Sequence, residues 1–266
     1  MEYKFGKLPA RIDRRTIPLK AIIRRELLPP LPVAFDNHQH YSIEDNFVFN
    51  NSKYGDCVVA ARAHHTLVLE AFEQLKQIQI LDEEVVSEYF EQTGGADRGL
   101  VLLWSLRDWK NDGWLVGGKN YTIYAFASVD WKDHEEVRHC IHLLGGVNLG
   151  ITLYREDMNQ FTSHETWHVT ETPGEKVGGH GVHSFAYDDE GITLMTWGRA
   201  QKAVWDWWDA RVDEAYCVVD NRNHWLPDSP VDIEKLDGYL QEITEGRGEP
   251  QGCLALSWIM RLFKRR

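Results

Sequence analysis

The sequence has few cysteines and no long apolar run. Its four cysteines, Cys57, Cys140, Cys217 and Cys253, lie far apart and form no Cys-x-x-Cys pair. We therefore expect neither a structural zinc site nor a disulfide framework, and we expect a reducing, cytoplasmic setting. No stretch approaches the roughly 18–20 apolar residues that cross a bilayer. The N-terminus also lacks the apolar core of a secretory signal, so the sequence predicts no membrane partner.

Basic charge is scarce outside the two ends of the chain. The net charge is −12 over 266 residues, but residues 1–26 carry +5 and residues 261–266 carry +4, which leaves −21 for the segment between them. Such an acidic body argues against nucleic acid as the main partner. We interpret the two basic ends as solvated termini. The sequence carries no signal for an oligomeric state.

The chain divides by composition into three parts. Residues 1–45 are basic and rich in proline, as in the run LLPPLPV, and prolines so close together exclude helix. We therefore expect an extended arm over 1–45 that wraps the domain surface and could cover a cleft. We expect the catalytic domain over 46–225 and a C-terminal extension over 226–266 that packs on it.

Helical patterns come first in the chain and strand patterns second. Apolar residues at three- and four-residue spacing and acidic first turns predict helices from Asp56, from Asp82 and over 99–111. The remaining expected elements are a strand at 121–129, a helix at 133–144, a strand at 147–154, an irregular loop at 155–178, and strands at 183–187, 192–197, 203–208 and 215–219. This segregation predicts an α+β fold rather than alternating βαβ units.

One cysteine and one histidine stand where they could react together. Cys57 follows the expected N-cap, and the partial positive charge of a helix N-terminus favours the nucleophilic thiolate. The alternative for Cys57 is a buried structural cysteine. His180 follows two glycines at the start of a strand, and a histidine near a cysteine can take its proton and pass it to a leaving group. His183, three residues on, faces the other side of that strand, so only one of the two can face Cys57.

Three segments together resemble the papain family of cysteine peptidases. Asn51-Ser-Lys-Tyr-Gly-Asp-Cys57 looks like the stretch from the family's oxyanion glutamine to its cysteine. The segment from His180 to Asp188 resembles the family's histidine strand, and Thr196-Trp197-Gly198 resembles the end of its Asn-Ser-Trp-Gly motif. The resemblance covers about 45–220. The chain is also similar to a group of papain-like proteins from bacteria and phages that share Leu-Pro-Ala-Arg, Gly-Asp-Cys and Gly-Gly-His.

The resemblance implies a papain-like fold, with Cys57 on the first long helix of a helical half and an antiparallel β half after it. Cys57 would attack a carbonyl carbon and His180 would hold its proton. Asn51 would donate its side-chain N–H to the oxyanion, with the backbone N–H of Cys57 as the second donor. Trp197 would shield the pair from water. The implied substrate is a peptide or an amide, and no cofactor or metal is implied.

The sequence departs from the family pattern at one important position. The asparagine that orients the family's histidine falls on Met195, which cannot accept a strong hydrogen bond from an imidazole. Thr196 or Asp188 is the possible substitute, and a dyad without an orienter is a further option. The function implied is a cysteine-dependent hydrolase that forms an acyl-thioenzyme.

Two alternatives remain open at the level of sequence. One is a catalytically inactive papain-fold protein that serves binding or structure, which a deeply buried Cys57 would favour. The other is an acyltransferase of the transglutaminase type. Among the remaining histidines, His38 and His40 are interpreted as surface residues because no third metal ligand accompanies them, and His64 as a core or rim residue.

Overall fold

The computed structural model describes residues 3–40, 47–74, 77–220 and 229–245. By its contacts the chain divides into two units, residues 1–232 and residues 233–266. In the second unit the structure describes one helix, α8 (Ile233–Glu245). The rest of the expected C-terminal extension, with Cys253 and the basic tail, lies outside the described residues. None of the described helices is both long enough and apolar enough to cross a bilayer.

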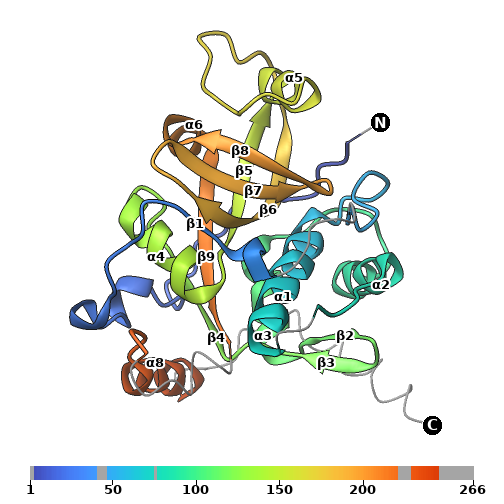
Figure 1. The fold of residues 1–266 in the computed structure, drawn as a ribbon. Helices are drawn as coiled ribbons and strands as arrows, with labels where there is room; N and C mark the ends of the chain where they lie inside the picture. Colours follow the sequence, from blue (N-terminus) through green and yellow to red (C-terminus); the bar gives the residue numbers. More distant parts are fainter. Residues whose placement is uncertain (1–2, 41–46, 75–76, 221–228, 246–266) are drawn as a thin grey trace. The chain divides into compact units, whose positions relative to one another are not determined.

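Three consecutive helices gather on one side of the first unit. They are α1 (Cys57–Gln74), α2 (Asp82–Thr93) and α3 (Leu102–Asn111), followed by a hairpin of β2 (Trp114–Val116) and β3 (Lys119–Tyr121) (Figure 1). Both α2 and α3 pack against α1. The core between them is made of buried aliphatic and aromatic residues, among them Val85, Tyr89 and Trp109. These side chains recur at helical spacing, which is why the helices were predictable from the sequence.

The second half is an antiparallel sheet. Its main strands are β4 (Ala125–Ser128), β5 (Val147–Tyr154), β6 (Lys176–Tyr187), β7 (Gly191–Thr196), β8 (Arg199–Val204) and β9 (Val212–Val219). They are ordered β4-β9-β5-β6-β7-β8, and β1 (Phe35–Asp36) pairs with β6. Helix α4 (His134–Leu144) packs on β5, β6 and β9, and α1 packs on β6. The α+β class, with a helical half followed by a sheet half, is thereby confirmed.

Two expected elements differ in the structure. The polar segment 155–178, expected to be irregular, begins with helix α5 (Arg155–Thr162), and the strand expected at 203–208 ends at 204, where α6 (Trp205–Arg211) begins. One buried carboxylate stabilises both helices. Asp157 accepts hydrogen bonds from the Tyr154 backbone N–H (2.7 Å), Trp207 Nε1 (2.8 Å) and Arg211 Nε (2.9 Å). Partners fifty residues apart leave no local pattern in the sequence.

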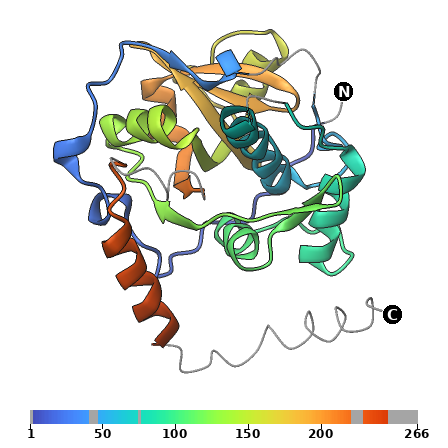
Figure 2. The ribbon, with the colours of Figure 1, turned by 60° about the horizontal axis from the view of Figure 1, so that its bottom comes forward.

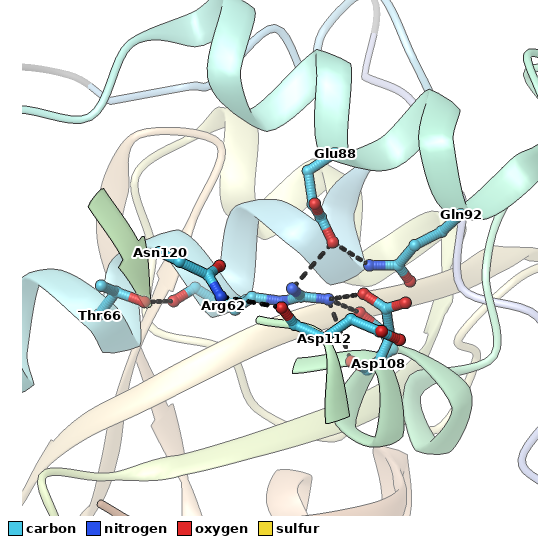
Figure 3. A network of polar contacts seen from close by, with 8 residues as sticks. Arg62, Thr66, Glu88, Gln92, Asp108, Asp112 and Asn120 are labelled. Atoms are coloured by element: carbon cyan, nitrogen blue, oxygen red, sulfur yellow. Dashed lines mark hydrogen bonds and ion pairs between the residues drawn. The ribbon is translucent and has the colours of Figure 1, made fainter. Parts of the chain in front are cut away.

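A buried ion network fixes the helix that begins at Cys57. Arg62, in the second turn of α1, donates to Glu88 Oε1 (3.0 Å) on α2 and to Ser105 Oγ (2.8 Å) on α3 (Figure 3). Its Nη2 also lies 3.7 Å from Asp108 Oδ2. Burial raises the pKa of Asp108 to about 7, and the Arg62 charge opposes that rise. Because buried charges need such partners, the network sets the position of α1 against the other two helices.

The N-terminal arm covers a long path over the first unit. It contains three short 3-10 turns, η1 (Leu19–Ala21), η2 (Arg25–Leu27) and η3 (Asn37–His40), and passes beside α4 (Figure 2). Its first described residues run between the two halves. The Lys7 N–H donates to Gly179 O on β6 (3.2 Å), while the Leu8 N–H donates to Leu100 O on the helical side (2.8 Å). The arm thus joins the two halves at the point where Cys57 lies.

Candidate active site

The thiol of Cys57 lies at the first residue of α1. The first N–H groups of a helix have no intrahelical partner and leave a partial positive charge there. Cys57 Sγ accepts a hydrogen bond from the Gly181 N–H, at 3.3 Å, so the sulfur contacts the β6 backbone directly after His180. The thiol is fully buried. That burial raises the pKa of Cys57 to about 11, against backbone hydrogen bonds from Gly181 and Gly6 that lower it.

His180 lies on β6 with its two ring nitrogens in different surroundings. Its Nε2 lies 2.8 Å from Thr196 Oγ1, on the neighbouring strand β7. Its Nδ1 is buried and has no hydrogen-bond partner among the described residues. Burial lowers the pKa of His180 to about 3, so the ring is neutral at pH 7. A neutral ring held at Nε2 keeps Nδ1 available for a proton.

Thr196 thus contacts the imidazole, whereas the asparagine of the family pattern falls on Met195, one residue earlier. The hydroxyl is buried with the rest of the side chain. A threonine hydroxyl can either donate to or accept from an imidazole, so it fits both neutral tautomers. Met195, one residue earlier, alternates to the other side of β7 and packs with Phe185 and Ala186.

Asp188, the other possible orienter, is not brought near His180. It lies just after the last residue of β6, eight residues from His180, which is roughly 26 Å along an extended strand. Its carboxylate accepts from the Gly191 N–H (2.9 Å) and pairs with Lys202 Nζ (2.9 Å). The first contact closes the turn between β6 and β7, and the second reaches β8. Asp188 is a turn residue, because most of β6 separates it from His180.

Asn51 contacts the loop that precedes Cys57. Its Nδ2 donates to Asp56 Oδ1 (3.0 Å) and to Tyr54 O (3.2 Å). Burial raises the pKa of Asp56 to about 8, and the hydrogen bond from Asn51 lowers it. In this structure the amide therefore holds the chain at the entry to α1. Its role as an oxyanion donor stays a prediction.

Trp197 forms one wall around His180. The two rings are stacked, with centroids 4.0 Å apart and planes at 14°. The Trp197 backbone has a φ of 43°, a left-handed conformation that is rare for an aromatic residue, in the turn between β7 and β8. Phe5 of the arm packs edge-on against both His180 (6.2 Å) and Trp197 (5.6 Å). The aromatic residues exclude water from the imidazole.

The arm supplies site residues that sequence reasoning missed. Gly6 passes so close to the loop before Cys57 that a Cβ on Gly6 would lie 1.7 Å from Gly55 O. The side chain of Lys7 is only 1% exposed and pairs with Asp213 (2.6 Å) and Glu214 (3.1 Å). The interpretation of the basic N-terminal end as a solvated terminus is therefore wrong for Lys7. No local signal could have revealed this, because the partners lie 206 residues away.

A second group of histidines lies under α1. His183 stacks on His65, with centroids 4.4 Å apart, and His65 Nδ1 lies 2.8 Å from Asn148 Nδ2. His38 stacks on Phe185 at 3.4 Å and is buried, so its interpretation as a surface residue is wrong. His64 is also buried. Within the described ranges, no three His, Cys, Asp or Glu side chains are arranged to hold a metal ion.

Comparison with known proteins finds similarity in fold but not in sequence. No family model matches the chain, and no curated protein matches it. Solved structures do match. Xylellain, a cysteine protease from Xylella fastidiosa, is 13% identical with a TM-score of 0.65 over 82% of this chain and 97% of that chain. The chain has the papain-like fold.

Two further papain-like structures agree with that assignment. Procathepsin B S9 from Trypanosoma congolense is 10% identical, with a TM-score of 0.57 over 82% of this chain and 86% of that chain. Digestive procathepsin L 3 of Tenebrio molitor larval midgut is 11% identical, with a TM-score of 0.54 over 79% and 75% of the two chains. The papain-like fold predicted from the order of the cysteine and histidine segments is thus confirmed. Identities this low speak for the fold and not for the role of any residue.

Proposed function

We propose that the protein is a cysteine-dependent hydrolase of peptide or amide bonds, with Cys57 as the nucleophile and His180 as its base. One observation carries the proposal. The backbone N–H directly after His180 contacts Cys57 Sγ, while Thr196 holds the far nitrogen of the same imidazole. A nucleophile, a base and a group that orients the base are the parts that such chemistry needs.

The reaction would proceed through two half-reactions. His180 takes the thiol proton as Cys57 Sγ bonds to the carbonyl carbon. The carbon–nitrogen bond then breaks, and His180 gives that proton to the departing amine. In the second half-reaction His180 takes a proton from water, the water oxygen bonds to the acyl carbon, the carbon–sulfur bond breaks, and His180 returns the proton to Cys57 Sγ. The unpaired N–H groups at the start of α1 are suited to stabilise the oxyanion in both steps.

The arm favours a neutral resting state of this pair. Burial raises the pKa of Cys57 to about 11 and lowers that of His180 to about 3, so both groups are uncharged at pH 7. A thiolate–imidazolium pair needs a more polar environment than this closed cleft provides. Displacement of residues 3–8 would admit water and substrate together. We therefore propose that activity requires the arm to move from the cleft.

Complete burial of Cys57 also favours the second candidate, an inactive papain-fold binding protein. The two candidates differ in what happens when the arm is loosened. Phe5→Ala removes the ring that packs on His180 and Trp197 but leaves the Cys57–His180 pair intact. An enzyme gains reactivity from this change, whereas a binding protein does not.

A peptidyl acyloxymethyl ketone, which alkylates activated thiolates, tests the proposal. Intact-mass measurement of the Phe5→Ala variant should show one adduct, mapped to Cys57 and absent from the Phe5→Ala/Cys57→Ala variant. Hydrolysis of a peptide library by the same protein then establishes turnover. A Phe5→Ala variant that stays folded, takes up no probe and cleaves no peptide would support the binding protein instead.

A further inference from the structure

The arm residue Lys7 places its side chain in an acidic pocket, formed by Asp213 and Glu214, beside the Cys57–His180 pair. Its Nζ lies 2.6 Å from Asp213 Oδ1 and 3.1 Å from Glu214 Oε1, two consecutive residues of β9. The lysine side chain is 1% exposed and that of Glu214 is 5% exposed, whereas that of Asp213 is 35% exposed. A lysine ammonium is usually left in water, and it is fully buried only when it is paired. The pocket is therefore built around a cation.

Two glycines make room for the long side chain. A Cβ on Gly150 of β5 would lie 1.9 Å from Lys7 Cε, and a Cβ on Gly179 of β6 would lie 2.4 Å from Lys7 O. Any larger residue at either position would therefore collide with the lysine or its backbone. The strands thus leave a slot for a linear aliphatic stem that ends at two carboxylates.

Neighbouring hydroxyl groups hold the carboxylates in place. Thr152 Oγ1 donates to Asp213 Oδ2 (3.2 Å), and the Tyr216 hydroxyl donates to Glu214 Oε2 (3.2 Å). Each carboxylate thus keeps one oxygen for a cation and uses the other for a fixed partner. Such support is typical of a binding site that is already formed before its ligand arrives.

The pocket adjoins the reacting groups through the backbone. The Lys7 N–H donates to the carbonyl of Gly179, the residue before His180. Gly6, directly before Lys7, lies against the loop at Gly55, and its backbone lowers the pKa of the Cys57 thiol. A polypeptide in the position of the arm would thus lay its backbone over Sγ and place the neighbouring side chain in the acidic pocket.

We propose that this pocket selects substrates with a lysine or arginine next to the bond that is cleaved, and that Lys7 occupies it until such a substrate displaces the arm. The cleavage step rests on the proposed function, whereas the preference for a basic side chain rests on the pocket alone. An empty pocket would leave two close carboxylates without a cation, which disfavours apolar occupants. The net charge of −21 between the two basic ends would also attract a basic polypeptide.

Binding to the full chain tests the selectivity directly. The probes are two fluorescein-labelled hexapeptides that differ only in lysine or norleucine at one central position. In the Lys7→Ala/Cys57→Ala variant, which vacates the pocket and prevents turnover, anisotropy should give at least tenfold tighter binding of the lysine peptide. With Asp213→Asn and Glu214→Gln added, the two peptides should bind alike. Equal affinities before the carboxylates are removed, or a preference that survives their removal, would overturn the proposal.

A second measurement applies if Lys7→Ala weakens the fold. n-Butylammonium has the shape and charge of the missing side chain, and n-butanol has only the shape. The unfolding midpoint of Lys7→Ala should rise with n-butylammonium and not with n-butanol, and the Asp213→Asn/Glu214→Gln derivative should respond to neither. An equal response to both compounds contradicts a pocket for cations.

Cleavage of the same peptides separates this proposal from the function on which it rests. The variant for this test is Lys7→Ala with Cys57 intact. If it cleaves both peptides equally well, the hydrolase function is supported and the selectivity of the pocket is contradicted. If the lysine peptide binds selectively but neither peptide is cleaved, the pocket is supported and the hydrolase function is contradicted.

Discussion

His180 and His183 lie three residues apart on β6, both buried and both with a lowered pKa, yet their surroundings differ. His180 faces a hydroxyl, an indole and the residues beside Cys57, and the arm residue Phe5 packs on it. His183 faces α1 and stacks on His65, under a helix fixed by the Arg62 network. Burial lowers the pKa of both. The comparison teaches that a shifted pKa does not distinguish a reactive histidine from a core histidine, whereas its partners and its cover do.

The largest expected effect is on catalysis. In the Phe5→Ala background, His180→Asn should lower kcat/KM for peptide hydrolysis by roughly 10³–10⁴-fold, because it removes the base. His183→Asn should leave kcat/KM within about threefold per folded molecule, since His183 faces away from the thiol. Steady-state kinetics corrected for the folded fraction checks this. A larger loss with His183→Asn than with His180→Asn would reverse the assignment.

The next effect runs in the opposite direction and concerns stability. His183→Asn should lower the free energy of unfolding by about 2–4 kcal/mol, because it leaves a cavity beside His65 under α1. His180→Asn should cost less, since the arm and Trp197 can close over the smaller side chain. Urea unfolding followed by fluorescence of the 11 tryptophans measures both variants. Equal losses would mean that the two sites do not differ in rigidity.

A smaller effect concerns the group that orients His180. Thr196→Val keeps the shape of the side chain and removes the hydroxyl that lies 2.8 Å from Nε2. We expect kcat to fall by roughly 10- to 100-fold, as for a residue that positions a base without reacting. Thr196→Ser should recover most of the loss. Failure of serine to recover it would show that packing, not the hydroxyl, is what His180 needs.

The smallest expected effect is a pH dependence of the unfolding free energy that is due to His64, one of the buried histidines under α1. Burial lowers the pKa of His64 to about 3, so the folded state binds its proton more weakly than the unfolded chain, whose value is near 6.5. Stability from this neutral ring is present above pH 6.5 and is lost as the pH falls. His64→Gln should therefore become less harmful by roughly 1.3 kcal/mol between pH 7 and pH 5.5. An exposed histidine, His168→Gln, is the matched control in the same urea series.

A comparison of wild type with His64→Gln at several pH values also removes an opposing effect from the result. Burial raises the pKa of Asp56 to about 8 and that of Asp108 to about 7, so both acids favour the fold as the pH falls below those values. Their contribution is common to wild type and His64→Gln and cancels in the difference. A difference that stays constant with pH would mean that His64 titrates alike in the folded and unfolded chain.

Local pattern explains much of what the sequence predicted. Apolar spacing predicted α1 from Cys57 onward, and the residues of β5 were predicted at 147–154 as observed. Strand parity separates His180 from His183, and the structure places them on opposite faces of β6. The short range of these signals is the reason they can be read from one segment at a time.

Long-range pairing explains what the sequence could not predict. Lys7 pairs with Asp213 across 206 residues, Asp157 needs Arg211 to complete its site, and buried His38 stacks on Phe185. Taken alone, each of these polar residues fits a solvated surface. Thr196 could be named as an orienter from its place beside Met195, but its choice over Asp188 required the register of β6 and β7.

The reactivity of Cys57 toward iodoacetamide tests the central claim most directly. At pH 7, mass-spectrometric rates for Cys57 should rise at least tenfold from wild type to Phe5→Ala, and should fall again with Phe5→Ala/His180→Asn but not with Phe5→Ala/His183→Asn. Cys140 and Cys217, both buried, provide internal reference rates. A Cys57 rate that equals theirs in Phe5→Ala, or that does not depend on His180, would contradict a reactive pair beneath the arm.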